Sequence, residues 1–260
     1  MPLREIDTSR PHPARMYDYY LGGKDSYDVD REAAERILSL HPDGRRLALL
    51  NRNFMHRAAR LLAERGVRQF LDIGTGIPTK PNLHQVVQGV VRDARIVYVD
   101  NDPIVLRHAE ALLRSTPEGQ TKYIDADVRE PQKIIEEARK VLDFDQPVAL
   151  SMVALLHFIP DGDNPYGLVR DLLAPLCPGS YVMLSHVTGD FDPRAWEKII
   201  SIYRESGISA QARSLGEFTR FFGGLEVLDP GVSVATQWRP EPEQEGGRDL
   251  ALYVGVAQKP

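Results

Sequence analysis

Three aspartates lie at or near the ends of apolar segments in the first half of the chain: Asp72, Asp100 and Asp127. The carboxyl ends of parallel strands meet at one edge of a sheet, so we expect these carboxylates to face one ligand. A carboxylate at Asp100 can accept hydrogen bonds from both hydroxyls of a ribose, and Asp127 would lie near an adenine amino group. The alternative is that these aspartates only cap helices or end strands.

A Gly-x-Gly sequence follows the first apolar segment, in the order Gly74, Thr75, Gly76, and we call residues 74–79 the glycine loop. Glycines allow a sharp turn and a close approach of the backbone to a ligand. A dinucleotide site requires a third glycine where this chain has Thr79. Asp72, just before the loop, suits a cationic group such as the amino group of a methionine moiety. The pattern therefore favours S-adenosyl-L-methionine over a nicotinamide dinucleotide.

His157 follows the apolar run 147–156 and is the candidate general base, because a neutral imidazole can accept a proton near pH 7. The alternative is that His157 only fixes the path of a neighbouring loop. His186, near the end of the apolar run 180–187, is a second candidate base.

The segment that begins at Tyr17 combines aromatic residues, glycines and a lysine without helical periodicity. It is interpreted as a lid in which Tyr17, Tyr20 and Gly22 approach the methionine end of the cofactor. Lys24 or Arg15 could then pair with the cofactor's carboxylate. The alternative is a loop whose aromatic side chains pack on the edge of the sheet.

Metal chemistry is not expected. Asp161, Asp163 and Asn164 lie in the segment IPDGDNP, where Asp and Asn are ordinary turn residues. The one cysteine, Cys177, cannot form an internal disulfide or a multi-cysteine metal site. We therefore predict no metal site.

Five apolar segments alternate with helical segments, which predicts a doubly wound α/β sheet of parallel strands. The predicted strands are 69–74, 94–100, 120–127, 147–156 and 180–187, and the predicted helices are 81–91, 103–115, 131–142 and 163–175. Two further strands, 225–229 and 249–257, should pair as an antiparallel hairpin. The expected fold is a mostly parallel seven-stranded sheet.

Residues 1–65 are predicted to form a helical cap over the carboxyl edge of the sheet, and residues 66–260 to form the ligand-binding core. Residues 1–14 and 230–247 have the composition of loops. Four large residues recur at helical spacing in the C-terminal part and are interpreted as core rather than substrate pocket. They are Trp196, Ile199, Ile200 and Tyr203.

The chain has 260 residues and a formal net charge of −5, with no basic block that would bind nucleic acid. It contains no run of about 18 apolar residues that would span a membrane. The first residues lack the apolar region of a secretory signal. A cytoplasmic location is therefore expected, without nucleic-acid or membrane partners, and the oligomeric state stays open.

The motifs LDIGTG, VDNDP and DADVRE resemble those of class I S-adenosylmethionine-dependent methyltransferases, which have a Rossmann-like fold. From about Arg15 to Ala257 the chain also resembles an actinobacterial family of such enzymes with unassigned substrates. The shared segments include RMYDYYLGGKDSYDVDREAA and LLHFIPD. The resemblance implies that Gly74 and Gly76 approach the cofactor, that Asp100 holds its ribose, and that Asp127 and Val128 flank the adenine. Asn101, next to Asp100, is a further candidate cofactor-binding residue.

The leading hypothesis is methyl transfer from S-adenosyl-L-methionine to a small-molecule acceptor. The alternative is a non-catalytic S-adenosylmethionine-binding sensor or scaffold, which would need no base at His157. An aminopropyltransferase would require paired carboxylates for a polyamine, and no convincing set is present. A nicotinamide oxidoreductase is disfavoured by Thr79 and by the closing hairpin.

Overall fold

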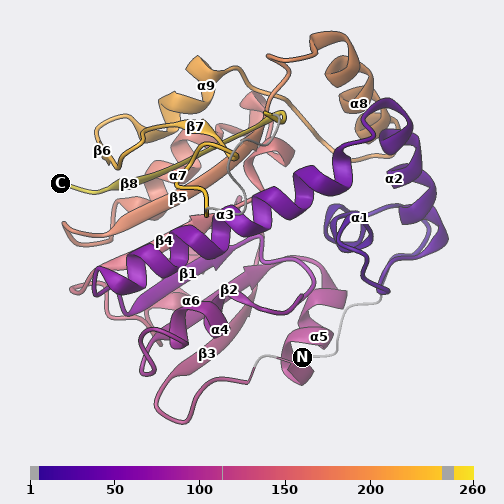
Figure 1. Cartoon of the computed structure of the whole chain (residues 1–260). Helices are drawn as coiled ribbons and strands as arrows, with labels where there is room; N and C mark the ends of the chain where they lie inside the picture. Colours follow the sequence, from indigo (N-terminus) through magenta and orange to yellow (C-terminus); the bar gives the residue numbers. More distant parts are fainter. Residues whose placement is uncertain (1–5, 113, 242–248) are drawn as a thin grey trace.

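The structure, a computed structural model, describes residues 6–112, 114–241 and 249–260. Its centre is a sheet with strand order β3-β2-β1-β4-β5-β8-β6 (Figure 1). The five predicted parallel strands are present as β1 (Gln69–Ile73), β2 (Arg95–Asp100), β3 (Gln120–Asp125), β4 (Val148–Met152) and β5 (Tyr181–Val187). Strands β2 and β3 lie on one side of β1, and β4 and β5 lie on its other side. This places the switch point, where such sheets bind ligands, between β1 and β4.

The antiparallel end of the sheet differs from the prediction in detail. β8 (Leu252–Gln258) pairs antiparallel with both β5 and β6 (Glu226–Val227), so the antiparallel pairing of the last two predicted strands is confirmed. β7 (Ser233–Val234) also pairs with β8 and brings the sheet to eight strands. A two-residue strand has no apolar periodicity, so the sequence could not show it inside the predicted loop. Residues 242–247 of that loop lie outside the described residues.

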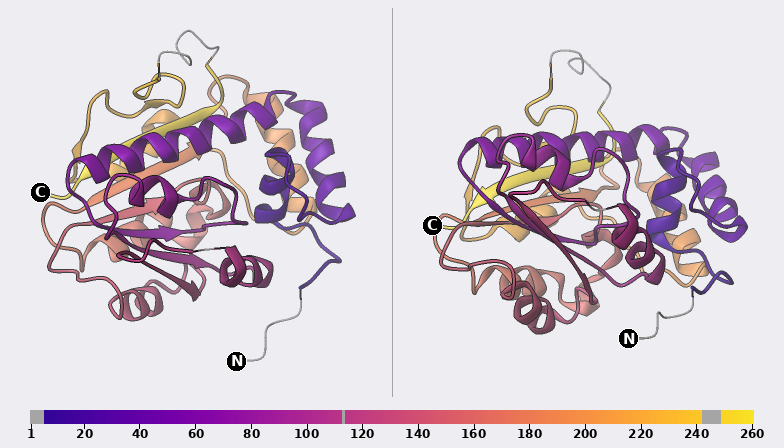
Figure 2. Two further views of the ribbon diagram at one scale, coloured as in Figure 1. Left: turned by 60° about the horizontal axis from the view of Figure 1, so that its bottom comes forward. Right: turned by 90° about the horizontal axis from the view of Figure 1, so that it is seen from below.

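Helices cover both faces of the sheet (Figure 2). α3 (Gly44–Glu64) and α4 (Leu83–Gln88) pack on one face, and α6 (Pro131–Ala138), α7 (Pro165–Leu173) and α9 (Leu215–Thr219) pack on the other. Phe70 belongs to the first of these hydrophobic clusters and its neighbour Leu71 to the second, because successive strand side chains point to opposite faces. α5 (Pro103–Leu112) contacts β3.

Three further helices gather at one end of the sheet: α1 (Pro13–Tyr20), α2 (Asp28–Leu40) and α8 (Pro193–Glu205) (Figure 1). α3 starts beside them and then continues across the sheet. Phe54 and Ala58 on its predicted apolar face are fully buried in the same cluster as Phe70, whereas Leu61 is half-buried. The division at residue 65 stays a prediction. Within the described residues 6–12, no helix or strand precedes α1, and residues 1–5 lie outside the description.

Side-chain caps begin both helices of the C-terminal part. Asp192 accepts a hydrogen bond from the backbone N–H of Ala195 and caps α8 (3.1 Å). Ser214 and Glu217 form the capping box that starts α9. None of the described helices has the length and hydropathy needed to cross a lipid bilayer.

Candidate functional site

A cavity of about 550 Å³ lies where the strand ends, α1 to α3 and α8 meet. Eleven of the twelve predicted site residues line it: Tyr17, Tyr20, Asp72, Gly74, Thr75, Gly76, Asp100, Asn101, Asp127, Val128 and His157. The twelfth, Gly22, is not among the lining residues. It has φ +82° directly after α1, and its N–H donates to the carbonyl oxygen of Tyr19 (3.1 Å). Gly22 thus supplies the left-handed backbone that ends the helix.

The glycine loop needs its glycines for two different reasons. Gly74 and Gly76 have φ values of +74° and +68°, a region that other residues rarely adopt. A Cβ atom at Gly74 would also lie 2.8 Å from Cδ1 of Leu155, whereas space at Gly76 is open. The open space beside Gly76 lets a ligand approach the backbone.

Asp100 shapes this loop as well as facing the cavity. Its Oδ2 accepts a hydrogen bond from the Gly76 N–H (2.7 Å), and its Oδ1 accepts one from the Asp102 N–H (3.0 Å). Burial raises the pKa of this carboxyl, and the two backbone hydrogen bonds partly oppose the shift. An ionised carboxylate has about four acceptor positions. Two remain for the hydroxyls of a ribose.

Asp127 is held in place by its neighbours. It accepts hydrogen bonds from Nδ2 of Asn101 (2.7 Å) and from the N–H of Arg129 (2.8 Å). Val128, which follows it, is a buried apolar residue of the cavity wall. A polar and an apolar side chain at one strand end suit the edge and the face of an adenine ring.

Asp72 and Arg52 face the same part of the cavity. Burial raises the pKa of Asp72 to about 6; the nearby charge of Asp100 adds to this shift and that of Arg52 opposes it. Arg52, on α3, donates hydrogen bonds to the carbonyl oxygens of Thr79 and Pro81 and so fastens the glycine loop to that helix. Arg52 was not predicted as a site residue, because nothing in its helical context distinguishes it from a surface arginine.

The predicted lid residues have different roles. The Tyr17 hydroxyl donates to the carbonyl oxygen of Ala48 (2.9 Å) and accepts from Nδ2 of Asn51 (3.0 Å), which anchors α1 to α3. Tyr20 and Tyr203 of α8 pack against the same hydrophobic cluster, and burial raises the pKa of Tyr203 to about 12. The aromatic side chains therefore both line the cavity and join the helices around it.

The two candidate partners for a cofactor carboxylate are not supported. Lys24 is not among the cavity-lining residues. Arg15 lines the cavity, but its Nε donates to Oδ1 of Asp30 (3.1 Å), and its two terminal nitrogens donate to the carbonyl oxygens of Asp7 and Arg10. All three guanidinium nitrogens thus have protein partners, and Arg15 acts as an anchor for the segment that precedes α1.

His157 lies farther along the chain from its strand than predicted. β4 ends at Met152, and Ala154, with φ +58°, turns the chain across the strand ends. His157 then falls in the short 3₁₀ helix η1 (Leu156–Phe158). Its side chain lines the cavity at 9% exposure, and its Nδ1 has no hydrogen-bond partner among the described residues. Burial, together with the charge of Arg213, lowers its pKa to about 3, so the imidazole is neutral at pH 7.

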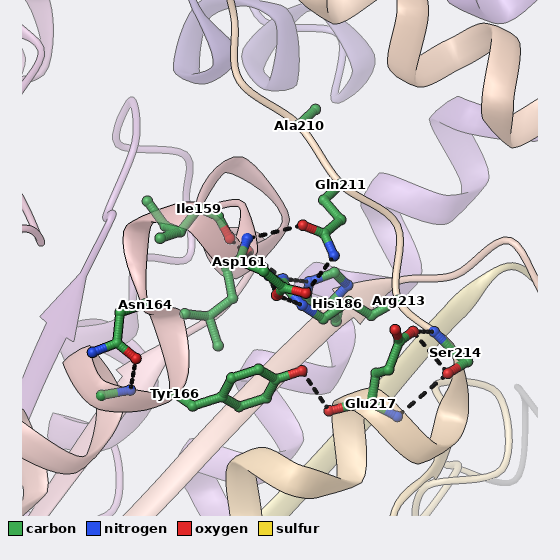
Figure 3. A network of polar contacts seen from close by, with 12 residues as sticks. Ile159, Asp161, Asn164, Tyr166, His186, Ala210, Gln211, Arg213, Ser214 and Glu217 are labelled. Atoms are coloured by element: carbon green, nitrogen blue, oxygen red, sulfur yellow. Dashed lines mark hydrogen bonds and ion pairs between the residues drawn. The ribbon is translucent and has the colours of Figure 1, made fainter.

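His186, the second candidate base, is engaged in a buried network (Figure 3). Its Nδ1–H donates to the carbonyl oxygen of Val187 (2.7 Å), and its Nε2 accepts from Nη1 of Arg213 (2.7 Å). Both ring nitrogens are thereby occupied, and His186 is not among the cavity-lining residues. Its role is structural, because neither nitrogen is available to a substrate.

Arg213 is the centre of that network and was not predicted. It is 1% exposed and donates to the carbonyl oxygens of Leu156 (3.0 Å) and Ile159 (2.9 Å) and to the carboxylate of Asp161 (2.7 Å). These contacts hold the segment that carries His157. Arg213 lies more than fifty residues from Leu156, Ile159 and Asp161 and 27 residues from His186, so no local pattern could reveal it.

The residues of the IPDGDNP segment have partners that explain them without a ligand. Asp161 pairs with Arg213, Asp163 pairs with Arg129 (2.8 Å), and Asn164 caps α7 by accepting from the Gly167 N–H (3.2 Å). In the part of the chain that the structure describes, no group of three or more His, Cys, Asp or Glu side chains could hold a metal ion.

The apolar stripe on α8 belongs to the core, as predicted, and it also forms a wall of the cavity. Trp196, Ile199 and Ile200 are buried, yet they and the half-buried Tyr203 line the cavity. Helical periodicity identifies the buried face of a helix but not whether side chains or a ligand cover that face. The cavity therefore has a polar part at the strand ends and an apolar part at α8.

The fold is a Rossmann-like, doubly wound sheet of the class I methyltransferase type. It has a glycine loop after β1, a carboxylate at the end of β2 and an antiparallel last strand. The whole chain, residues 1–260, matches the family described as S-adenosyl methyltransferase, and the protein belongs to that family. Its members use S-adenosyl-L-methionine as the methyl donor, so this chain is a methyltransferase with that cofactor.

Solved structures agree with this assignment. A DUF574-family protein from Streptomyces avermitilis is 45% identical, with a TM-score of 0.96 over 98% of this chain and 100% of the other. A candidate methyltransferase from Thermobifida fusca is 38% identical, with a TM-score of 0.87 over 97% and 96% of the two chains. Magnesium protoporphyrin IX methyltransferase from Synechocystis, solved with bound S-adenosylhomocysteine, is 12% identical with a TM-score of 0.53 and shares the fold. No curated protein matches the chain.

Proposed function

We propose that the protein transfers a methyl group from S-adenosyl-L-methionine to a small-molecule acceptor held in the apolar part of the cavity. One observation carries the proposal: a single cavity joins three carboxylates at the strand ends to an apolar wall on α8, with His157 as a further lining residue. The cavity is of the size that holds small ligands.

The residues present fit the cofactor by their chemistry. Asp100 would accept from the ribose hydroxyls, Asn101 and Asp127 would meet the adenine edge, and Asp72 would face the amino group of the methionine moiety. Gly76 leaves open space for the close approach. When bound, the cofactor supplies a methyl group on a positively charged sulfur.

The task that remains for the protein is to orient the acceptor and exclude water. His157 can accept a hydrogen bond from a donor on the acceptor, because its imidazole is neutral. A group with a pKa of about 3 retains a proton poorly at pH 7, so His157 would orient the acceptor more than it would store its proton. The described residues include no feature that favours the non-catalytic alternative. The cytoplasmic location stays a prediction.

Binding of the cofactor tests the proposal first. Calorimetry should give micromolar affinity for S-adenosylmethionine and S-adenosylhomocysteine and none for NAD. Asp100→Ala should weaken binding about tenfold or more, since it removes hydrogen bonds to a charged group. The exposed Asp93, which pairs with Arg68 at the other end of the sheet, gives the control Asp93→Ala, which should bind normally. Binding of NAD alone would contradict the proposal.

A further inference from the structure

We infer that the methyl acceptor is an uncharged, mostly apolar ring compound with one hydrogen-bonding group, bound against α8 with that group at His157. The inference rests on the proposed function, because the cofactor must occupy the polar part of the same cavity. It goes further by naming the chemical class of the acceptor and the wall that selects it.

The charged side chains of the cavity lie at one end. Every Asp and Arg among the described lining residues comes from the segment before α2, from α3 or from the ends of β1, β2 and β3: Asp7, Arg10, Arg15, Arg52, Asp72, Asp100, Asp127 and Arg129. The lining residues of α8, of the 207–210 segment and of the 153–159 segment include none. A charged acceptor at this second end would lose its hydration without gaining an opposite charge, which is costly.

The second end has flat walls. The rings of Phe158 and Tyr203 meet edge to face with centroids 5.6 Å apart, and those of His41 and Trp196 lie 5.7 Å apart. Ile200 completes this wall; it is 8% exposed and lines the cavity. Aromatic walls bind planar apolar groups by offset or edge contacts. The shape and the polarity of this end both indicate a ring.

His157 supplies a buried polar atom at this end that lacks a protein partner among the described residues. Its ring packs against Phe158 with centroids 4.3 Å apart, which continues the aromatic wall. Its buried Nδ1 has no hydrogen-bond partner in the described residues, in contrast to the fully engaged His186. A buried polar atom without a partner is costly, and a hydroxyl or amine on the acceptor would satisfy it.

A pair of probes with the same ring system and different charge tests the inference. 2-Naphthol is uncharged at pH 7, and 2-naphthoate carries a carboxylate on the same ring system. Both would be titrated into protein saturated with S-adenosylhomocysteine, with binding followed by calorimetry and by quenching of tryptophan fluorescence. We expect 2-naphthol to bind about tenfold or more tightly than 2-naphthoate, because only the anion must lose its hydration without a partner.

Variants of α8 locate the binding site. Ile200→Glu should weaken 2-naphthol binding about tenfold or more, because the new carboxylate would face an apolar ligand. Ile200→Trp should also weaken it by filling the space without adding charge. Ser201→Glu adds the same charge to the exposed face of the same helix and should have no effect. His157→Phe should weaken 2-naphthol binding while it preserves the aromatic wall.

The affinity for S-adenosylhomocysteine, measured for each variant, separates this inference from the proposed function. The inference holds if the Ile200 variants retain that affinity and lose 2-naphthol. It is overturned if the saturated protein binds 2-naphthoate as tightly as 2-naphthol, if it binds neither, or if both Ile200 variants bind 2-naphthol as tightly as the unaltered protein does. If S-adenosylhomocysteine does not bind the unaltered protein, the proposed function fails, and this inference fails with it.

Discussion

At the scale of single residues, the site depends on carboxylates whose surroundings differ. Asp100 accepts two backbone hydrogen bonds, which fix its orientation toward the glycine loop. Asp72 is buried beside it, and burial raises its pKa to about 6, with a further contribution from the nearby charge of Asp100. Asp100 thus holds the glycine loop. In the proposed function it would also bind the ribose, and Asp72 would bind a cationic group of the ligand.

Cofactor affinity should depend on pH through Asp72. Its carboxylate is ionised above a pKa of about 6 and would then attract the ammonium group of the ligand. Affinity for S-adenosylhomocysteine should therefore fall as the pH decreases through 6, by about tenfold between pH 7 and pH 5. Calorimetry at these two pH values measures the change. Asp72→Asn should bind weakly at both, and an equally steep pH dependence in this variant would assign the titration to another group.

At the scale of elements, one buried guanidinium connects segments that are distant in the sequence. Arg213 precedes α9, yet its contacts lie on the segment after β4 and on β5 (Figure 3). The segment after β4 carries His157 and has Ala154 in the left-handed region, so its path needs external support. Arg213 provides that support through two carbonyl oxygens and a carboxylate.

Removal of Arg213 should disorganise this part of the site. Arg213→Met would leave buried carbonyl oxygens and Nε2 of His186 without donors, and we expect the free energy of unfolding to fall by about 3 kcal/mol or more. Asp161→Asn removes only the exposed charge of the pair and should cost no more than about 1 kcal/mol. Urea denaturation of both variants measures the difference. Equal losses would show that the carboxylate, and not the buried contacts, carries the network.

At the scale of the whole molecule, one wall of the cavity is formed by residues of the segment 6–12, which has no helix or strand. Residues 7 and 10–12 line the cavity, and Ile6 before them packs against the cluster that contains Ile77 of the glycine loop. They are held by Asp30 on α2, which is fully buried and accepts from the N–H of His12 (2.9 Å) and from Arg15 (3.1 Å). The site therefore depends on an ion pair between two cap helices as well as on the strand ends.

Disruption of the ion pair between Arg15 and Asp30 should release residues 6–12 from the cavity wall. Asp30→Ala leaves the buried Arg15 without its counter-charge, and the free energy of unfolding should fall by about 3–5 kcal/mol. Affinity for S-adenosylhomocysteine should fall as well, because the segment before α1 loses its anchor. Asp28→Ala is the matched control, since Asp28 lies in the same helical turn with its side chain 86% exposed. Hydrogen exchange of residues 6–12 should increase only in Asp30→Ala, and unchanged exchange there would contradict the assigned anchor.

The sequence by itself determined the parallel part of the sheet and the polar end of the site. Both depend on local order along the chain: an apolar strand, a glycine loop, and carboxylates where strands end. A parallel sheet brings all such ends to one edge, so residue order was enough to place Asp72, Asp100 and Asp127 together. Gly22 was assigned to the cavity because a glycine that ends a helix and a glycine beside a ligand look alike in a sequence.

Only the tertiary structure decided what lies opposite that edge. Arg52, Arg213 and the pairing of Arg15 with Asp30 join segments that are distant along the chain, and a local pattern holds no information about such contacts. The same limit applies to α8, whose periodicity showed a buried face but not that a cavity lies beside it. Nor could the sequence distinguish His157 from His186. His157 follows one apolar run and His186 lies near the end of another. Only packing occupies both nitrogens of His186 and leaves Nδ1 of His157 without a partner among the described residues.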